Sequence, residues 1–222
     1  MNAKEGRNII KDMETAVLIF DDVTALDVVG PTEVLSKIPG MTVKYVAAQP
    51  GVKRCDGGLG IVADFSLENV PKPDVVLIPG GKGTKSLFGD TKVIGWVRSA
   101  HENSKWTASV CTGAFILGAA GILKGLRATT HWLALEQLGK FGAIACKERV
   151  VIDGKVISSA GVSAGIDMAL TLAERIASPN TAKAIQLGIE YDPAPPFEAG
   201  SPEKAPPEIV EMVRRKAAER NK

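Results

Sequence analysis

The cysteine at position 111 stands where the local sequence could support nucleophilic chemistry. In "WTASVCTGAFILGAAGIL", Trp106 to Leu123, an apolar strand-like run passes into a helix-like run of small residues. Unpaired N–H groups and the positive end of the helix dipole favour a thiolate, which predicts a lowered thiol pKa. Gly113 permits a tight turn there. Cys111 is therefore a candidate nucleophile, and from this motif alone a buried structural cysteine is the alternative interpretation.

A carboxyl group is the second candidate. Asp27 falls early in the helix expected after the first strand, just ahead of Gly30-Pro31. An acid at that position also suits the helix dipole, which is a purely structural explanation. If its carboxyl reaches over the sheet end toward the cysteine, the two negative charges repel when desolvated. One proton shared between the two groups would then supply a general acid.

Backbone N–H groups are the third component. The turn at Cys111 aims the Thr112 N–H at whatever bonds to the sulfur. The Gly80-Gly81 pair ends the apolar run "DVVLIPGG", so an N–H there could face the same pocket. A Pro-Gly-Gly turn is common, and this signal is weak by itself.

The other reactive side chains fit ordinary explanations as well as functional ones. His131 in "RATTHW" is either a base for the cysteine or a capping residue at a helix start. Asp167 would orient a partner or serve as a first-turn helix acid, and His101 is expected at the surface. Cys55 and Cys146 have no comparable setting, so both are interpreted as structural.

Composition limits the function classes. The 222 residues carry a net charge of +2 with 45% hydrophobic residues, which argues against nucleic acid as the main partner. No run approaches the ~20 apolar residues of a membrane span. The polar start "MNAKEGRNIIKD" lacks a signal-peptide core, so reduced thiols in a cytoplasm are expected. Two histidines and three scattered cysteines make a metal site implausible.

The elements that would position these groups alternate between strand and helix. Buried strands are predicted at 15–20, 41–49 and 74–79 and in the run ending at Val110, with hairpins at 54–67 and 148–161. Helices are predicted at 24–39 (capped by Thr24 and interrupted at Gly30-Pro31), 90–103, from Cys111 onward, 131–142 and 163–178. This alternation predicts an α/β fold with a mostly parallel sheet covered on both faces. Ligands bind such sheets beyond the carboxyl ends of the strands.

Three segments are expected along the chain. Residues 1–14 are interpreted as a disordered or loosely ordered N-terminal segment, and residues 15–190 as one α/β domain. Residues 191–222 form a proline-rich arm followed by a helix from about Pro207 to Arg220, predicted to pack on the domain or on a dimer partner.

Several of these segments together resemble a known family. They are "DVVGPTEVL", "LIPGG", "SVCTGAFILGAAGILKG", "ATTHWLALEQLG", "ERVVIDGKVISSAGVSAGIDMAL" and "LGIEYDPAPPFEAGSPEKAP". From about Thr15 to Pro206 the chain resembles the isonitrile hydratases. These enzymes belong to the class I glutamine amidotransferase-like superfamily of PfpI-type proteases and the Parkinsonism-associated deglycase. The Cys-Thr-Gly and Thr-Thr-His-Trp segments are shared more widely, whereas Asp-x-x-Gly-Pro with the Tyr-Asp-Pro tail points to the hydratases.

The resemblance implies a flavodoxin-like three-layer sandwich with a nucleophile elbow, a homodimer, and no cofactor. Cys111 would match the nucleophile, Asp27 the acid/base, and Thr112 the neighbour that tunes the site. The Gly81 N–H would match an oxyanion donor, and His131 is retained without a required catalytic part. The branches with Glu in place of Asp27 have a longer side chain, so Asp leaves more room for a substrate carbon or a water.

The activity implied is hydration of an isonitrile to an N-substituted formamide, a carbon–oxygen lyase (hydro-lyase) reaction. One alternative is a cysteine amidase, peptidase or deglycase that uses Cys111 with His131. Another is a non-enzymatic redox or ligand sensor, since a nucleophilic cysteine is also oxidisable. The end of the sequence at Lys222 is expected to leave no room for an appended DNA-binding unit.

Overall fold

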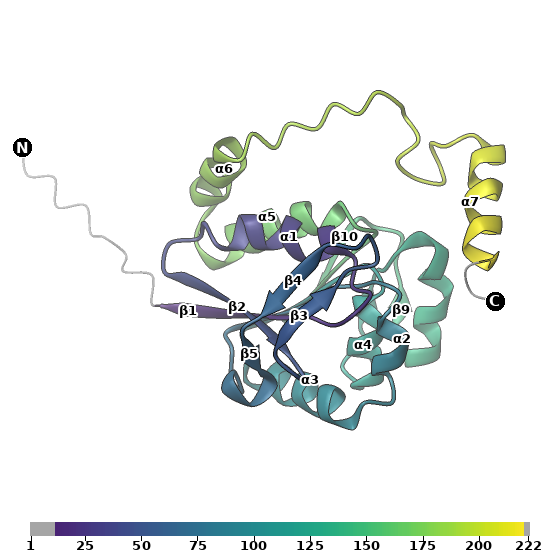
Figure 1. Ribbon diagram of the computed structural model, residues 1–222. Helices are drawn as coiled ribbons and strands as arrows, with labels where there is room; N and C mark the ends of the chain where they lie inside the picture. Colours follow the sequence, from purple (N-terminus) through teal and green to yellow (C-terminus); the bar gives the residue numbers. More distant parts are fainter. Residues whose placement is uncertain (1–11, 220–222) are drawn as a thin grey trace, which may run out of the picture. The chain divides into compact units, whose positions relative to one another are not determined.

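A computed structural model describes residues 12–219, and the chain divides into two compact units between Ile189 and Glu190. The first unit is built on a seven-stranded sheet in the order β10-β11-β7-β6-β1-β2-β5. Figure 1 labels β10, β1, β2 and β5 of this sheet. All neighbouring strands are parallel except β10 and β11. The strands are β1 (Met13–Leu18), β2 (Met41–Ala47), β5 (Phe65–Ser66), β6 (Val75–Ile78), β7 (Trp106–Val110), β10 (Val150–Asp153) and β11 (Val156–Ser159).

The central strands form because their sequences are apolar on both faces. Every residue of β6 is buried, as is every residue of β7 after Trp106. Helices cover both faces of a parallel sheet, so its strands read as continuous apolar runs rather than alternating ones. In the register, Val17 of β1 lies between Tyr45 of β2 and Leu77 of β6.

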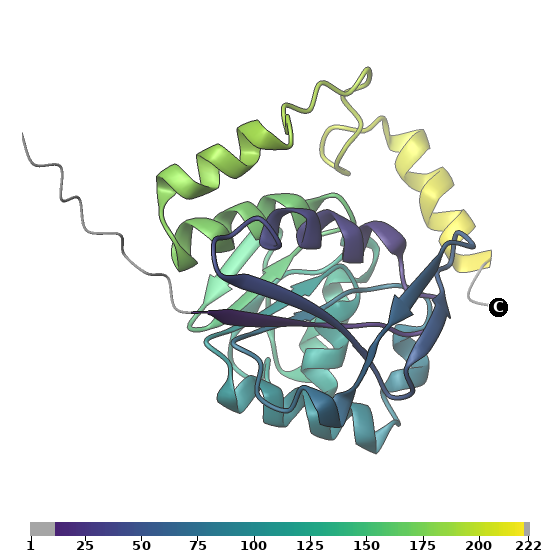
Figure 2. The ribbon, with the colours of Figure 1, turned by 60° about the vertical axis from the view of Figure 1, so that its left-hand side comes forward.

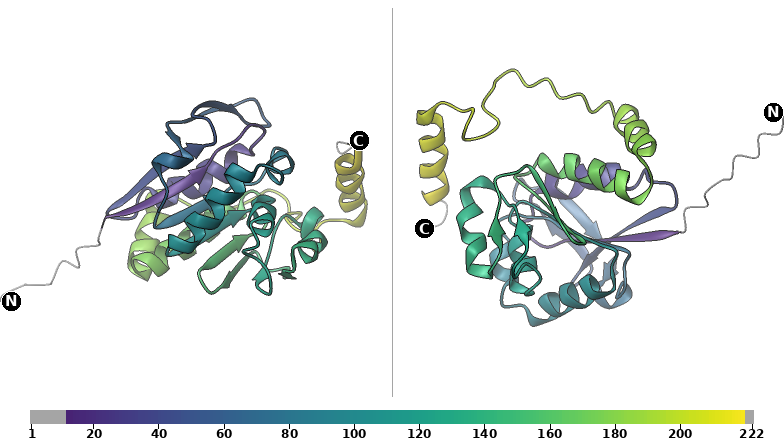
Figure 3. Two further views of the ribbon diagram at one scale, coloured as in Figure 1. Left: turned by 90° about the horizontal axis from the view of Figure 1, so that it is seen from below. Right: turned by 180° about the vertical axis from the view of Figure 1, so that it is seen from behind.

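Helices lie on both sides of this sheet. On one side α1 (Ala25–Leu35) packs along α5 (Ala164–Ile176), which also contacts α6 (Pro179–Gly188). On the other side α4 (Gly113–Ala119) contacts α3 (Thr91–Asn103) and the short α2 (Thr84–Leu87). Figure 2 shows α1 and α5 above the sheet and α3 below it, and the rear view in Figure 3 shows the same layers. The predicted flavodoxin-like three-layer sandwich is confirmed.

Helix α1 differs from its prediction because tertiary packing overrides a local breaker. It runs without interruption through Gly30 and Pro31 and ends at Leu35. A Cβ on Gly30 would lie 3.1 Å from the Ile166 side chain of α5, and a Cβ on Gly165 would lie 3.3 Å from Pro31. Gly30 on α1 and Gly165 on α5 thus let the two helices approach closely, with Pro31 packed in the contact. The Thr32 hydroxyl also donates to the Val28 carbonyl at 2.8 Å, inside the same turn.

Other boundaries differ in detail. Strand β1 begins at Met13 rather than residue 15, and the predicted 131–142 helix is a 3₁₀ helix, η2 (Trp132–Phe141). Both hairpins are confirmed, the first as β3 (Gly51–Arg54) with β4 (Gly60–Ala63), the second as β10 with β11. The sequence interpretation missed α2 and α6, the 3₁₀ turn η1 (Leu67–Asn69), and the paired strands β8 (Arg127–Ala128) and β9 (Ile144–Ala145).

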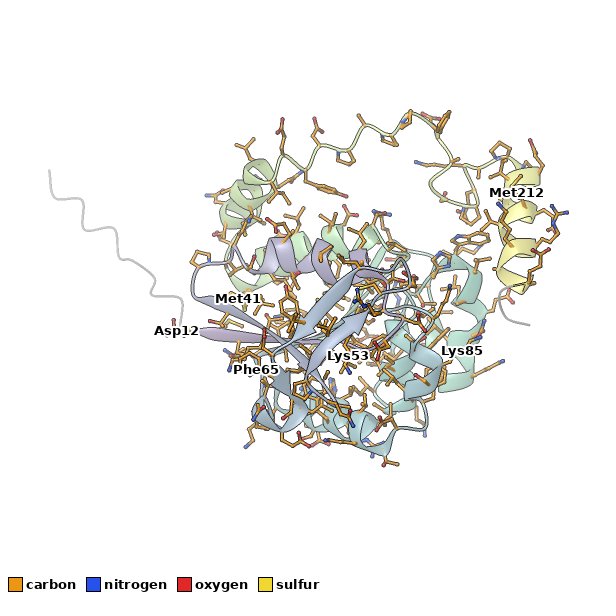
Figure 4. All side chains as sticks on the ribbon, in the orientation of Figure 1. Asp12, Met41, Lys53, Phe65, Lys85 and Met212 are labelled. Carbon is orange, nitrogen blue, oxygen red and sulfur yellow. The ribbon has the colours of Figure 1, made fainter. Side chains whose placement is uncertain are left out.

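The second unit holds the proline-rich arm and helix α7 (Pro207–Glu219). The helix is confirmed within the described residues, and no side chain on it is buried; Met212 is labelled in Figure 4. Segment 1–11 and Arg220 lie outside the described residues. That this unit packs on the domain or on a dimer partner stays a prediction.

Within residues 12–219, no helix has both the length and the apolar character needed to cross a membrane.

Lys155 anchors the far end of α3 to the β10–β11 hairpin. Its ammonium group donates to the carbonyls of His101, Glu102 and Ser104, at or just beyond the C-terminus of the helix. A cation there satisfies orphan carbonyls and complements the helix dipole. Lys155→Met is expected to lower the free energy of unfolding by about 2 kcal/mol in urea denaturation, the scale of charge-assisted hydrogen bonds.

Lys183→Met, at an exposed position on α6, is the matched control and is expected to change the free energy of unfolding by less than about 0.5 kcal/mol. Equal effects of the two substitutions would show that the three carbonyl contacts contribute nothing.

Candidate active site

Cys111 sits on a strained turn between β7 and α4. Its φ is 55°, a left-handed conformation that is uncommon for any residue with a side chain. The surrounding backbone holds it there. Its N–H donates to the carbonyls of Ser159 and Ala160 at 3.2 and 3.0 Å, and its carbonyl accepts from the Thr130 hydroxyl at 2.6 Å. Bonds from two other chain segments thus fix the predicted nucleophile elbow.

Two glycines are needed for the elbow to close on the sheet. A Cβ on Gly113 would lie 2.1 Å from the Ile78 carbonyl oxygen, so only glycine lets α4 start against the end of β6. A Cβ on Gly80 would lie 2.6 Å from the Thr112 nitrogen and 2.9 Å from Asp27 Oδ2. The same backbone proximity that excludes larger residues brings α1, β6 and α4 together at one point.

Asp27 projects from the first turn of α1 into this point and is fully buried. Its Oδ2 accepts the Gly80 N–H at 2.9 Å. Among residues 12–219, no N–H or O–H group donates to its Oδ1. The carboxyl instead interacts with the Cys111 thiol, which favours its charged form. The two side chains singled out in the sequence, 84 positions apart, are therefore neighbours in the fold.

The sulfur of Cys111 faces two backbone donors. The Thr112 N–H and hydroxyl and the Val162 N–H all stabilise negative charge on it. Val162 has a φ of 30°, a genuine outlier for a β-branched residue. Such strain persists where the surrounding structure over-determines it, and it clusters at functional sites. Sequence reasoning missed Val162, because nothing in "GVSAG" distinguishes the residue that donates to the sulfur.

Burial dominates the ionisation of this pair. The side chain of Cys111 is 7% exposed, and burial together with the negative charge of Asp27 raises the pKa of the thiol to about 12. The expected lowering of the thiol pKa by the helix terminus is therefore wrong. The N–H donors act in that direction but are outweighed by desolvation.

The carboxyl shifts upward as well. Burial raises the pKa of Asp27 to about 7, against the opposing effect of the Gly80 hydrogen bond, and the charge of Asp56 adds to the rise. Near neutral pH the pair thus holds at least one proton, as two buried acids in contact must. That the two groups share one proton stays a prediction.

The Gly81 N–H does not have the role of an oxyanion donor that the resemblance implied. Its N–H donates to the Thr112 hydroxyl at 3.0 Å, so it is not a free donor facing the sulfur. An oxyanion donor must have its N–H available, and here the donors at the sulfur are those of Thr112 and Val162. The Thr112 hydroxyl connects Gly81 to the sulfur, which gives Thr112 the central place in the turn.

His131 has the capping geometry that was one of its two interpretations. It precedes η2, and its Nδ1 accepts the Leu133 N–H at 3.3 Å. Its ring packs on Gly161, where a Cβ would lie 2.6 Å from Cδ2. Burial lowers the pKa of His131, so the ring is neutral at pH 7.

The remaining candidates have structural partners. His101 is half-buried rather than on the surface, and its Nδ1 forms a hydrogen bond with the Thr107 hydroxyl at 2.9 Å. Asp167 binds Arg149, with 2.6 Å between Oδ2 and Nε. Cys55 is buried and Cys146 half-buried, and both are free thiols.

A flavodoxin-like sandwich with a strained cysteine on its elbow and a buried acid beside the sulfur defines a class of cysteine-centred α/β proteins. The family model that matches residues 13–175 is DJ-1/PfpI, and the chain belongs to the DJ-1/PfpI family. It is 41% identical over 206 residues to a protein from Pseudomonas putida named isonitrile hydratase, covering 93% of this chain and 90% of that one.

Solved structures show the same relationship. A THiJ/PfpI family protein from Pseudomonas syringae superimposes with a TM-score of 0.92 at 35% identity, over 95% of this chain and 88% of that chain. DJ-1beta of Drosophila melanogaster, at 23% identity and a TM-score of 0.74, covers 81% of this chain and 98% of its own, and shares the fold.

Proposed function

We propose that this chain is an isonitrile hydratase, which converts R–N≡C to the N-substituted formamide without a cofactor. The observation that carries the proposal is the buried contact between the Asp27 carboxyl and the Cys111 thiol, at a sulfur faced by N–H donors. The 41% identity to the Pseudomonas putida protein named isonitrile hydratase supports the choice of substrate.

In the first step the sulfur forms a C–S bond to the terminal carbon of the isonitrile. The thiol proton passes through the Asp27 carboxyl to that same carbon, which gives the thioimidate R–N=CH–S–Cys111. The reactive form of the pair is therefore the one with a single proton, and activity is expected to rise as pH rises through the pKa of Asp27, about 7. A covalent intermediate divides the hydration into two easier steps.

In the second step water adds to the thioimidate carbon. Asp27 takes a proton from the attacking water and delivers that proton to the nitrogen, leaving R–NH–CH(OH)–S–Cys111 and an ionised Asp27. The C–S bond then breaks, the hydroxyl proton returns to the pair, and R–NH–CHO leaves. The N–H groups of Thr112 and Val162, which favour negative charge on sulfur, assist its departure.

The test is direct. The purified protein is incubated with alkyl and aryl isonitriles of different sizes, and formamide is followed by mass spectrometry against a protein-free control. Turnover with at least one isonitrile is the expected result. No formamide above the control from any of them would refute the proposed substrate class.

The competing proposal is a hydrolase that pairs Cys111 with His131. A substitution of His131 distinguishes the hydratase from this hydrolase. An asparagine can accept the Leu133 N–H in place of Nδ1. His131→Asn is expected to lower kcat/KM for isonitrile hydration by less than about 10-fold, because proton transfer runs through Asp27. A loss of 10²-fold or more, the typical contribution of a general base, would instead place His131 in the chemistry.

No observation on the described residues specifically favours a redox or ligand sensor. We further propose that the protein works as a cytoplasmic homodimer. Light scattering is expected to give twice the mass of one chain.

A further inference from the structure

Thr24 and Asp27 have the spacing of a helix capping box, yet neither makes the bonds of one. In a capping box the Thr side chain accepts an N–H of the first turn, and the acid three residues later accepts the Thr N–H. Here the Thr24 hydroxyl makes no cap hydrogen bond and instead donates to Asp56 Oδ2 at 3.1 Å. The Thr24 N–H donates to the Gly80 carbonyl at 2.9 Å, and Asp27 turns toward Gly80 and Cys111.

The backbone of Asp56 is held against the entrance to α1. Asp56 lies in the turn between β3 and β4, the hairpin on which Figure 4 labels Lys53. Its N–H donates to the Val23 carbonyl at 3.1 Å, and the Asp22 N–H donates to the Arg54 carbonyl at 2.7 Å. With the bond from Thr24, three hydrogen bonds join this turn to residues 22–24. Asp56 is exposed to solvent, and these bonds hold its carboxylate next to the helix start.

Among the charged groups near Asp27, Asp56 is the one whose charge can change how readily the Asp27 carboxyl ionises. The thiol of Cys111 and the carboxylate of Asp56 both act on the Asp27 carboxyl, and the negative charge of Asp56 opposes its ionisation. Asp21, in the loop that follows β1, is 3.9 Å from the Lys53 ammonium. On α5, which packs along α1, Asp167 is bound to Arg149.

We propose that Asp56 is a positioning residue of this site: its carboxylate holds the Thr24 hydroxyl at the start of α1 and sets, by its charge, how readily Asp27 gives up its proton. For the reaction this rests on the proposed hydratase function. The effect on the proton held by Asp27 and Cys111 does not require that function, because it concerns the unliganded protein.

The test measures the thiol itself. The rate of Cys111 alkylation by iodoacetamide is followed from about pH 5 to about pH 9, with peptide mass mapping to separate Cys111 from Cys55 and Cys146. Ionised Asp27 can accept the thiol proton as the sulfur reacts, so the rate is expected to rise with a midpoint at the pKa of Asp27, about 7. Asp56→Asn keeps an oxygen that can accept from Thr24 but removes the charge. It is expected to move the rise in rate to lower pH by about 0.5 pH unit at low salt, and by less at high salt.

Three further variants separate charge from position. Asp56→Glu restores the charge and is expected to restore the pH midpoint. Asp64→Asn, the matched control, removes an exposed carboxylate close to the same hairpin and is expected to leave the midpoint unchanged. Thr24→Val removes the hydrogen bond but not the charge. It is expected to lower the alkylation rate without moving the midpoint as far as Asp56→Asn does.

The outcomes separate this inference from the proposed function. An unchanged midpoint in Asp56→Asn, or an equal shift in Asp64→Asn, overturns the role of Asp56. A shifted midpoint in a protein that hydrates no isonitrile upholds Asp56 and defeats the hydratase proposal. If isonitriles are hydrated, the pH profile of kcat/KM is expected to shift in the same direction and by the same amount.

Discussion

Cys111→Ala is expected to lower kcat/KM for isonitrile hydration by at least about 10⁴-fold, because without the sulfur no thioimidate can form. Alanine retains the Cβ of the turn, and the bonds that hold the elbow come from its backbone, which the substitution keeps. The fold should therefore survive the change. Formamide production by mass spectrometry measures the loss, with circular dichroism as the check on folding.

Cys146→Ala is the matched control, since it removes a half-buried free thiol outside the elbow. It is expected to retain wild-type turnover. A second readout is the intact mass of the protein during turnover, in which a thioimidate adduct is expected on the wild type and none on Cys111→Ala. Undiminished formamide production by Cys111→Ala would contradict covalent catalysis altogether.

Asp27→Asn is expected to lower the activity and, at the same time, to make the free energy of unfolding less dependent on pH. The asparagine cannot donate and accept the proton that the pair shares, so kcat/KM is expected to fall by about 10²- to 10⁴-fold. The fold, by contrast, is expected to become less sensitive to pH. In the wild type, burial raises the pKa of Asp27 from the ordinary value near 3.8 to about 7. The folded protein therefore holds a proton that the unfolded chain has lost across this interval.

The sign follows from that difference in proton binding. The stabilisation due to protonated Asp27 is complete below pH 3.8 and is lost as pH rises to about 7. Because Asp27 is only half-ionised at pH 7, the wild type should lose about 2 kcal/mol of unfolding free energy between pH 5 and pH 7 that the variant keeps. Urea denaturation at both pH values measures this.

Glu33→Gln, at an exposed glutamate on the same helix, is the control for Asp27→Asn. It is expected to alter neither activity nor the pH dependence of stability. If Asp27→Asn and the wild type lost the same stability between pH 5 and pH 7, the pKa of the Asp27 carboxyl would not be raised in the folded protein. An asparagine variant with wild-type turnover would remove Asp27 from the mechanism.

The site concentrates features that cost stability. A buried carboxyl, a buried thiol and the left-handed conformations of Cys111 and Val162 meet at one sulfur. Backbone strain of this kind costs about 1–3 kcal/mol per residue. The hydrogen bonds from the Cys111 N–H to the carbonyls of Ser159 and Ala160, and from the Thr130 hydroxyl to the Cys111 carbonyl, offset part of this cost. Natural proteins violate local rules mostly where function requires it, which agrees with a reactive site at this point.

Local patterns in the sequence determined most of the fold. The strands are recognisable because a parallel sheet buries both of their faces, so runs such as Val75–Ile78 are apolar throughout. The Asp153-Gly154 turn and the glycine at position 142, whose φ is 74°, depend only on their own backbone and are equally readable. The position of Cys111 at a strand-to-helix junction follows from the same local logic.

Only the tertiary structure decided the chemistry of the site. The thiol pKa rises rather than falls because desolvation depends on every residue packed around the sulfur, not on its own helix. The Gly81 N–H binds Thr112, and the Val162 N–H reaches the sulfur from a loop 51 positions away. Hydrogen-bond partners and local dielectric are set by segments distant in the chain, so no local pattern encodes them.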